Sequence, residues 1–357
     1  RDYKVTGVQT CALPISTRKT VDEVSAYLNK EGFTAVAYHG GMNSIHRSKN
    51  QEAFLKGRVP WMVATSAFGM GIHKEDLRTI IHYHLPASIE QYIQECGRAG
   101  RDNQSARCLM LFSIADRRIH EALMIRAQPS LSDITLLLKL IYSKNQNWET
   151  TESELLKLIE TESHNHQPLL WNDKSLQKYM SILEEYGWVQ WLRDRGIWTI
   201  TKLPSPPSTE EITGRLNDRM SDSFSRLNTM EKFGTHQGCL RRFLANELDG
   251  PAIVECNNCS GCTGAFKIKI DANNPIVQTI LDFVKKYPEH TQLSTITWVL
   301  SGSKSRIVKQ NKLDHFQFYG ELKTFSQLEI REVTKSLFYA GKIQRNNELK
   351  SIQLATA

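Results

Sequence analysis

The sequence lacks three features that would assign it to a class at once. It contains no G-x-x-x-x-G-K-[ST] phosphate-binding loop, since the nearest string, at residues 301–305, lacks the first glycine and the Gly-Lys pair. No apolar run approaches the roughly 20 residues that span a bilayer, and no basic, apolar signal sequence opens the chain. We therefore expect a cytosolic protein without a membrane partner that cannot hold a nucleoside triphosphate in a P-loop of its own.

The composition is that of an ordinary globular protein with several domains. The 357 residues exceed a typical domain of roughly 150 residues, so we expect two or three domains. Hydrophobic residues at 40% and charged residues at 23% exclude a disordered or fibrous chain. The net charge of +7 is compatible with a polyanionic partner, although such a surplus can also serve only to keep a surface soluble.

The first residues carry no structural pattern. Residues 1–15 show neither helical nor strand periodicity and no initiator methionine, so we expect them to be either a disordered or foreign leader or the damaged end of a first strand, and we exclude them from the predicted fold. The pattern begins at residue 16, and Thr20 and Glu23 have the spacing of a capping box at the start of a helix that ends near Gly32.

Strands and helices then alternate up to residue 102. Predicted strands cover residues 33–38, 59–64 and 79–85, and a helix capped by Asn43 reaches Phe54. This alternation predicts an α/β lobe at residues 16–128, with a mostly parallel sheet covered on both faces and ligands at the carboxyl ends of the strands.

Three glycine-containing strings stand out in this lobe: HGGM at 39–42, TSAFGMGI at 65–72 and QECGRAGRD at 94–102. Glycine lets a backbone approach phosphate closely. Arg98 and Arg101 suit phosphoryl transfer, because a planar guanidinium can neutralise charge that develops on a γ-phosphate. An isolated Gly-Arg-x-Gly-Arg string can also be a solvated helix end, but the glycine-rich string upstream favours the functional interpretation.

Together, AFGMGI and QECGRAGRD resemble motifs V and VI of superfamily 2 helicases, and specifically of RecQ DNA helicases. The resemblance implies a second RecA-like motor lobe in which Arg101 is the arginine finger, Arg98 is its neighbour and Gln94 is a motif VI contact. It also implies nucleotide contacts at Gly71 and Asp76. ATP and Mg²⁺ would then belong to a first lobe outside this sequence, because no P-loop is present here.

The same resemblance implies contacts with the DNA backbone from Thr17, Arg18, Thr65 and Ser66. One position departs from the family pattern. RecQ proteins usually have Asp or Asn where this sequence has His73, which puts the local motif V contacts in doubt.

The next domain, at residues 129–203, has the element order of a winged helix. Three predicted helices precede two strands joined by a basic turn, and these elements span residues 131–142, 152–162, 173–186, 188–192 and 197–201. Glu184 and Glu185 on the third helix repel phosphate, so a packing role and direct DNA binding both stay open. We expect the tryptophans of the hairpin to fill its core.

A linker at residues 204–212 leads to a helical subdomain at residues 213–266 that contains four of the seven cysteines. These are Cys239, Cys256, Cys259 and Cys262. Four thiolates fit tetrahedral zinc at about 2.3 Å without an open position, which predicts a structural site, and an iron–sulfur cluster is the alternative. The surrounding strings resemble the RecQ zinc-binding subdomain, and the winged helix before it resembles a bacterial RecQ-like subgroup. The remaining cysteines, Cys11, Cys96 and Cys108, look unrelated to one another.

The C-terminal segment, residues 267–357, predicts a second winged helix. Its recognition helix would span residues 326–339, and strands at 342–346 and 351–354 would flank a wing at 347–349. The expected phosphate contacts are Ser303, Lys304, Ser305, Arg306 and Lys309. The strings LSGSKSR and FYGELKTFSQLEI resemble the RecQ C-terminal (RQC) winged helix, which implies a grip on duplex DNA ahead of a fork. An idle basic surface is the alternative.

The resemblance thus implies an ATP-dependent 3'-to-5' DNA helicase that acts on forked DNA in recombination and repair, as a monomer in the bacterial cytoplasm. A zinc-stabilised DNA-binding or adaptor protein without a motor is the alternative. An RNA-dependent ATPase would share the lobe, but the zinc and RQC-like strings argue against it.

Overall fold

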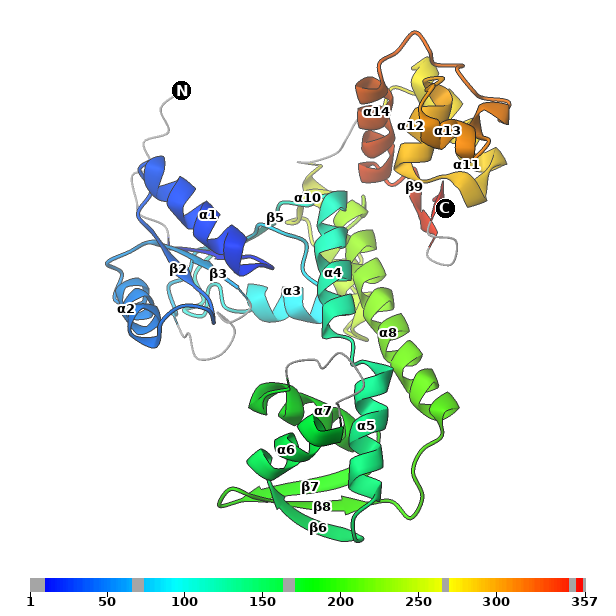
Figure 1. The fold of residues 1–357 in the computed structure, drawn as a ribbon. Helices are drawn as coiled ribbons and strands as arrows, with labels where there is room; N and C mark the ends of the chain where they lie inside the picture. The colour runs from blue at the N-terminus through cyan, green and yellow to red at the C-terminus, as the bar shows by residue number, and fades with distance from the viewer. Residues whose placement is uncertain (1–9, 66–73, 163–170, 265–269, 347–350, 356–357) are drawn as a thin grey trace. The chain divides into compact units, whose positions relative to one another are not determined.

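The computed structural model describes residues 10–65, 74–162, 171–264, 270–346 and 351–355. The chain divides into two compact units, one made of residues 1–120 and 226–357 and the other of residues 121–225 (Figure 1). The first unit contains an α/β lobe, a helical region with four clustered cysteines and a C-terminal winged helix. This confirms the multidomain fold class that the sequence predicts.

The lobe is built on a five-stranded parallel sheet with the strand order β2-β3-β1-β4-β5. Its elements follow in the order β1 (Cys11–Pro14), α1 (Arg18–Lys30), β2 (Ala35–Tyr38), α2 (Ser44–Leu55), β3 (Trp61–Ala64), β4 (Thr79–His82), α3 (Ile89–Cys96) and β5 (Arg107–Met110). The predicted parallel α/β lobe is confirmed, and β5 is a strand that the sequence pattern did not indicate.

The central strand β1 corrects the exclusion of residues 1–15 from the fold, because residues 11–14 form a strand, as the second alternative for this segment had it. Leu13 pairs with Val63 on β3, and Cys11 also lies opposite Thr79 on β4. The side chains of residues 11–13 and 15 are at most 5% exposed. Residues 11–14 contain no β-branched or aromatic side chain, and a strand that is buried on both faces shows no alternation, so the sequence pattern did not indicate this strand.

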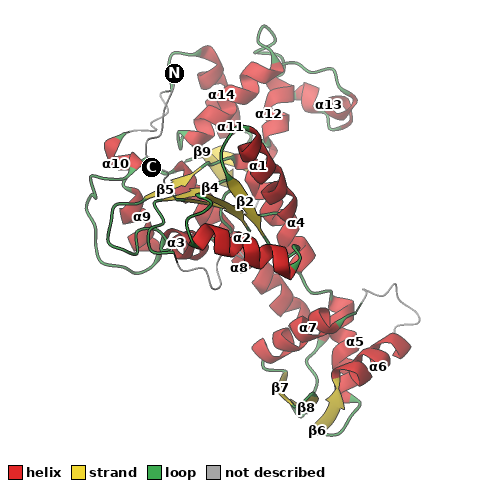
Figure 2. Cartoon of the chain, turned by 90° about the vertical axis from the view of Figure 1, so that its left-hand side faces the viewer, coloured by secondary structure: helices red, strands yellow, loops and turns green. Residues whose placement is uncertain are grey.

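Helices cover both faces of this sheet. On one face, Val21 of α1 packs in a cluster with Leu13. On the other face, Phe54 of α2 packs in a separate cluster with Met62. Figure 2 shows the strands of the lobe with these helices beside them. Both clusters exclude water from the sheet, and this leaves the strand ends and the loops that follow them as the places where polar groups can meet a ligand.

Helix α1 begins earlier than the predicted capping box. Thr17 is its N-cap, and the Thr17 Oγ1 accepts the backbone N–H of Thr20 at 3.2 Å. The predicted box between Thr20 and Glu23 is therefore wrong, because Thr20 already lies within the helix. Asn43 caps α2 as predicted and accepts the backbone N–H of Ile45 at 2.9 Å.

A buried ion pair joins the lobe to the long helix α8 (Thr209–Thr235). Arg117 begins α4 (Arg117–Ala127), and its Nη1 lies 2.9 Å from Glu231 Oε2 and 2.7 Å from Asn228 Oδ1. Both charged side chains are buried. Helices α9 (Leu240–Glu247) and α10 (Ser260–Thr263) complete the helical region.

Helix α8 also corrects the predicted linker, residues 204–212. The helix starts at Thr209, so only residues 204–208 connect two elements. Ile212 and Leu216, in the first turns of α8, pack into the core of the second unit. Their spacing of four residues places both on one face of a helix, so the helix begins before the predicted end of the linker.

The second unit contains the winged helix that the sequence predicts. Its elements are α5 (Leu131–Tyr142), β6 (Asn147–Thr151), α6 (Glu152–Glu162), α7 (Asp173–Glu185), β7 (Val189–Asp194) and β8 (Ile197–Lys202). Strand β6 was not predicted, and it pairs with β8 to make a three-stranded sheet in the order β6-β8-β7. Trp188 and Trp198 are at most 2% exposed, which confirms their place in the core, and Trp191 stacks on Trp198 at 4.7 Å.

The C-terminal winged helix comprises α11 (Pro275–Lys286), α12 (Leu293–Leu300), α13 (Arg306–Gln310), α14 (Gln327–Tyr339), β9 (Ile343–Asn346) and β10 (Ser351–Leu354). The predicted recognition helix and hairpin are confirmed, and Ser326 and Glu329 form a capping box at the start of α14. The expected wing tip at 347–349 lies outside the described residues. No helix within the described ranges is long and apolar enough to cross a membrane.

Candidate functional site

The loop that carries the two arginines is held in one conformation by its own backbone. Arg101 is exposed, and its Nε donates to the carbonyl oxygen of Gly97 at 3.1 Å. Gly100 has φ +63°, and a Cβ there would lie 2.8 Å from the carbonyl oxygen of Gln104. Only glycine fits that position, because the left-handed conformation and the close approach both exclude a side chain. The loop therefore presents the Arg101 guanidinium to solvent on an ordered backbone.

Arg98 has a different environment from Arg101. Its side chain is partly buried, and this burial together with the nearby charge of Arg101 lowers the pKa of Arg98 from the ordinary arginine value. Two like charges held together attract an anion more strongly than either alone. The two arginines thus concentrate positive charge on one loop.

Contacts with the start of β4 fix the position of this loop in the lobe. The backbone N–H of Gly100 donates to the carbonyl oxygen of Leu77 at 3.0 Å, and Arg78 forms an ion pair with Asp102. Since both partners immediately precede β4, the arginine loop lies at the amino-terminal edge of the sheet. Asp76 belongs to the same edge, and its carboxylate lies 3.0 Å from the Lys74 amine.

The predicted DNA-backbone residues lie at the opposite edge of the sheet. Thr17 and Arg18 follow β1, and Thr65 follows the neighbouring strand β3, so all three lie at the carboxyl edge. The exposed Arg18 side chain lies against the loop after β2, where its Cδ would be 3.1 Å from a Cβ on Gly41. The Thr17 hydroxyl is already used as a helix cap. Ser66, Gly71 and His73 lie outside the described residues.

Two buried side chains hold α3 against the sheet. The Nε2 of His82, on β4, lies 2.8 Å from the Oε2 of Glu95 on α3. The other Glu95 oxygen accepts the amide of Gln91 at 3.0 Å. The pair of His82 and Glu95 was not predicted from the sequence. A signal for Glu95 was present, since this residue lies within the QECGRAGRD string. Gln94, in contrast, is exposed.

The four cysteines predicted to bind metal converge on one point. The sulfurs of Cys239, Cys256, Cys259 and Cys262 all lie within 4.8 Å of one another. Two of the separations are 3.9 Å, between Cys256 and Cys262, and 3.6 Å, between Cys259 and Cys262. Tetrahedral zinc with Zn–S bonds of about 2.3 Å places its sulfurs about 3.8 Å apart. The donor set therefore fits zinc in spacing as well as in chemistry.

The backbone around Cys259 favours the thiolate form of this residue. Although burial alone would raise it, backbone N–H groups of Cys262 and Leu240 lower the pKa of Cys259 to about 6. The Leu240 N–H lies 3.2 Å from the Cys259 sulfur. A Cβ on Gly261 would lie 1.8 Å from the carbonyl oxygen of Gly238, so this turn closes only with glycine. Metal ligation requires the thiolate form that such a backbone stabilises.

The basic stretch of the C-terminal winged helix presents its cations to solvent. Lys304, Arg306 and Lys309 are exposed, whereas Ser303 and Ser305 are half-buried. The Tyr319 hydroxyl donates to the carbonyl oxygen of Ser303 at 3.0 Å and fixes the turn before α13. The cations are thus displayed on an ordered turn, and the serines contribute more to the turn than to the open surface.

Family models match the N-terminal and the C-terminal parts of the chain. The family described as "Helicase conserved C-terminal domain" matches residues 9–103, and the family described as "RQC domain" matches residues 269–356. The chain is 25% identical over 325 residues to the ATP-dependent DNA helicase RecQ of Bacillus subtilis, a match that covers 90% of this chain and 39% of that protein. The chain belongs to the RecQ family of helicases.

Shorter stretches are more similar to other RecQ relatives. One stretch is 43% identical over 101 residues to the ATP-dependent DNA helicase RecQ of Pasteurella multocida, covering 28% of this chain and 16% of that protein. Another is 47% identical over 100 residues to the RecQ-like DNA helicase blm-1 of Caenorhabditis elegans, covering 28% and 10%. The helicase match begins at residue 9, which agrees with the place of β1 in the RecQ lobe.

Proposed function

We propose that this chain supplies the second motor lobe, the zinc subdomain and the duplex-gripping winged helix of an ATP-dependent 3'-to-5' DNA helicase. The observation that carries the proposal is the exposed guanidinium of Arg101 on a loop that is anchored to a parallel α/β sheet. A rigidly held guanidinium can stabilise charge on a transferring phosphoryl group at no cost in reorganisation during the reaction.

In this proposal ATP and Mg²⁺ bind on another lobe. Arg101 reaches the γ-phosphate, Arg98 adds positive charge beside it, and Gln94, Gly71 and Asp76 complete the nucleotide side of this lobe. This chain has no P-loop, so it should not hydrolyse ATP by itself. We place the helicase in the bacterial cytoplasm, acting as a monomer in recombination and repair.

Zinc is the metal that we propose for the four-cysteine site. Four thiolates without an open position would hold the ion as a structural centre, and the ion would tie α9 and α10 together. Its chemistry would be confined to this crosslink, because no coordination position is left for a reacting ligand.

DNA contact is proposed at both the lobe and the C-terminal winged helix. Thr17, Arg18 and Thr65 would face the single strand at the carboxyl edge of the sheet, and we propose the same contact for Ser66, which lies outside the described residues. The basic stretch at residues 303–309 would hold the duplex. Residues 269–356 carry thirteen Lys and Arg against eight Asp and Glu, a net charge of +5, which favours this domain as the main electrostatic contact.

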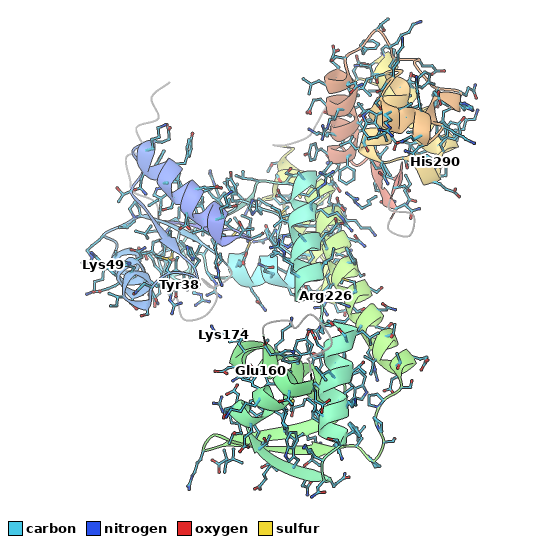
Figure 3. The ribbon with its side chains drawn as sticks, in the orientation of Figure 1. Tyr38, Lys49, Glu160, Lys174, Arg226 and His290 are labelled. Atoms are coloured by element: carbon cyan, nitrogen blue, oxygen red, sulfur yellow. The ribbon has the colours of Figure 1, made fainter. Side chains whose placement is uncertain are left out.

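The first winged helix is proposed to pack within the protein and not to bind DNA. Residues 129–203 carry eight Lys and Arg against ten Asp and Glu, a net charge of −2. Glu160 on α6 and Lys174 on α7 show this mixture of exposed charges (Figure 3). The Glu185 carboxylate lies 2.7 Å from the Arg219 guanidinium, so this acid has a partner within its own unit.

Fluorescence anisotropy with forked DNA tests the proposal on this chain. Binding should weaken steeply as salt rises from about 50 to 200 mM, because cations that neutralise phosphates release counterions. ATP turnover with forked DNA should stay at background. A flat salt response would refute the DNA grip, and ATP turnover by this chain would refute the assignment of the nucleotide to another lobe.

A second candidate is a zinc-stabilised DNA-binding or adaptor protein without a motor, which the absence of a P-loop in this sequence favours. The coding sequence upstream distinguishes the two. A P-loop followed by an acidic magnesium box establishes the motor, and their absence from the complete gene leaves the adaptor.

A further inference from the structure

Cys96 and Cys108 lie side by side, although the sequence gives no sign of a relationship between them. Cys96 is the last residue of α3, and Cys108 is the second residue of β5. The Cys108 sulfur lies 3.9 Å from the carbonyl oxygen of Cys96, and the two thiols are close enough for each to shift the pKa of the other. The earlier interpretation of these cysteines as unrelated is therefore wrong. The fold brings them together because the chain turns back from α3 into an adjacent parallel strand.

The two thiols differ in exposure and in acidity. Cys108 is exposed, and the hydrogen bond from Cys96 lowers the pKa of its thiol. The interaction with Cys108 is the main cause that raises the pKa of the Cys96 thiol, and burial of this thiol is the second cause. An exposed thiolate beside a protonated thiol is the arrangement in which one sulfur is oxidised first and the other resolves the product.

We propose that Cys96 and Cys108 form a reversible oxidation site, at which a hydroperoxide converts the two thiols into a disulfide. This inference does not depend on the helicase function, because it rests on the proximity, exposure and acidity of the two cysteines. Transient disulfides of this kind are the ones that occur in a reducing compartment.

The chemistry balances with a hydroperoxide as the oxidant. The Cys108 thiolate attacks the terminal oxygen of the hydroperoxide, the O–O bond breaks, and an alkoxide or hydroxide leaves as Cys108 becomes a sulfenic acid. Cys96 sulfur then attacks the Cys108 sulfur, the S–O bond breaks, and water leaves with the proton from Cys96. The two thiols together lose two electrons to the hydroperoxide. The products are the disulfide, one alcohol (or one water if hydrogen peroxide is the oxidant) and one water released from the sulfenic acid.

The disulfide would tether both ends of the arginine loop. Residues 97–107 lie between the two cysteines, and Arg98 and Arg101 are within that stretch. A crosslink across a short loop removes open conformations of the loop. Oxidation should therefore slow amide hydrogen exchange in residues 97–106, while exchange in α1 stays unchanged.

Peptide mapping of the zinc-loaded full chain tests the proposal. The chain is treated with hydrogen peroxide, alkylated, unfolded and cut with trypsin without reductant. Cleavage after Arg78, Arg98, Arg107 and Arg117 leaves Cys96 in residues 79–98 and Cys108 in residues 108–117. These two peptides should be joined by a disulfide that a reductant breaks, and Cys108 should react on the order of tenfold faster than Cys11. Cys11 is the internal control, since burial raises its pKa to about 12.

Two variants complete the test. Cys108→Ser should abolish the linked peptide, and Cys96→Ser should leave a sulfenic acid on Cys108 that dimedone traps. The proposal is overturned if the linked peptide does not form, if Cys108 proceeds only to the sulfinic acid, or if the zinc cysteines supply all the disulfides. Unchanged hydrogen exchange in residues 97–106 of the linked protein would overturn the tether.

Discussion

His82 and Glu95 face each other inside the lobe, with 2.8 Å between the His82 Nε2 and the Glu95 Oε2, and both side chains are shielded from solvent. One belongs to a strand and the other to the helix that leads into the arginine loop. The position of Arg98 and Arg101 thus depends on a clamp that lies away from the loop itself.

Breaking this clamp should destabilise the lobe. We expect Glu95→Ala to lower the free energy of unfolding by about 3 kcal/mol, because removing one partner leaves the other buried without compensation. Urea denaturation followed by circular dichroism measures the change. Glu75→Ala, at an exposed position, is the control and should change stability by less than about 0.5 kcal/mol. Equal losses in both variants would show that the pair is not a clamp.

The arginine finger assignment predicts a specific loss of catalysis. In the intact helicase, Arg101→Ala should reduce ATP turnover about 1,000-fold, because the guanidinium stabilises only the transferring phosphoryl group. Arg101→Lys should not restore the rate, since an ammonium lacks the planar fork. Arg107→Ala, an exposed arginine on β5, should keep the normal rate. Steady-state ATP hydrolysis with saturating DNA measures all three, and near-normal turnover in Arg101→Ala would remove the finger role.

The thiolate cluster predicts about one zinc and no iron per folded chain. Cys259→Ser should lose the metal and lower the melting temperature, because the binding free energy of a structural zinc contributes to folding. Cys108→Ser should retain the metal. Plasma emission spectroscopy with thermal melts measures both properties. Iron with acid-labile sulfide in the purified protein would establish the iron–sulfur alternative instead.

The basic stretch of the C-terminal winged helix predicts a change in salt dependence. Lys304→Ala with Arg306→Ala should weaken binding to forked DNA and reduce the slope of log K against log salt by about two, one for each lost phosphate contact. Lys157→Ala with Lys174→Ala removes the same charge from the first winged helix and should leave both quantities unchanged. The reverse result would place the DNA on the first winged helix.

Acid should destabilise the lobe through buried histidines. Burial lowers the pKa of His120, and the hydrogen bond to the carbonyl oxygen of Leu85 and the charge of Asp116 offset this only in part. Burial also lowers the pKa of His84. As pH falls below about 6.5, the unfolded chain binds protons that the folded chain does not, so stability falls with pH.

Thermal melts between pH 7.5 and 5.5, with the zinc content checked at each pH, measure this effect. His120→Gln should lose less melting temperature over that range than the wild type, and the exposed His46→Gln should behave as the wild type does. A pH dependence that is identical in all three proteins would exclude His120 as its source.

Local signals in the sequence predicted most of the elements. Asn43 is an N-cap as expected, and the predicted basic turn between β7 and β8 is a two-residue turn at Arg195 and Gly196, both of which have positive φ. The strands β1, β5 and β6 were missed, although β2, β3 and β4 are no longer than β1 and β5. The stretches of β1 and β5 contain no β-branched or aromatic residue, and β6 is an edge strand made mostly of polar residues. The four cysteines were predicted as ligands because their spacing is itself a local signal.

By itself, the sequence determined the class of each module, the four-cysteine cluster and the arginines of the motif, since each of these depends on residues near one another along the chain. Only the tertiary structure decided which residues share an edge of the sheet. It placed Thr17 and Thr65 at one edge and Arg101 at the other, and it brought Cys96 against Cys108. The physical reason is that the order of the strands and the helices that connect them decide which residues meet across a parallel sheet. The spacing of residues along the chain does not contain this information.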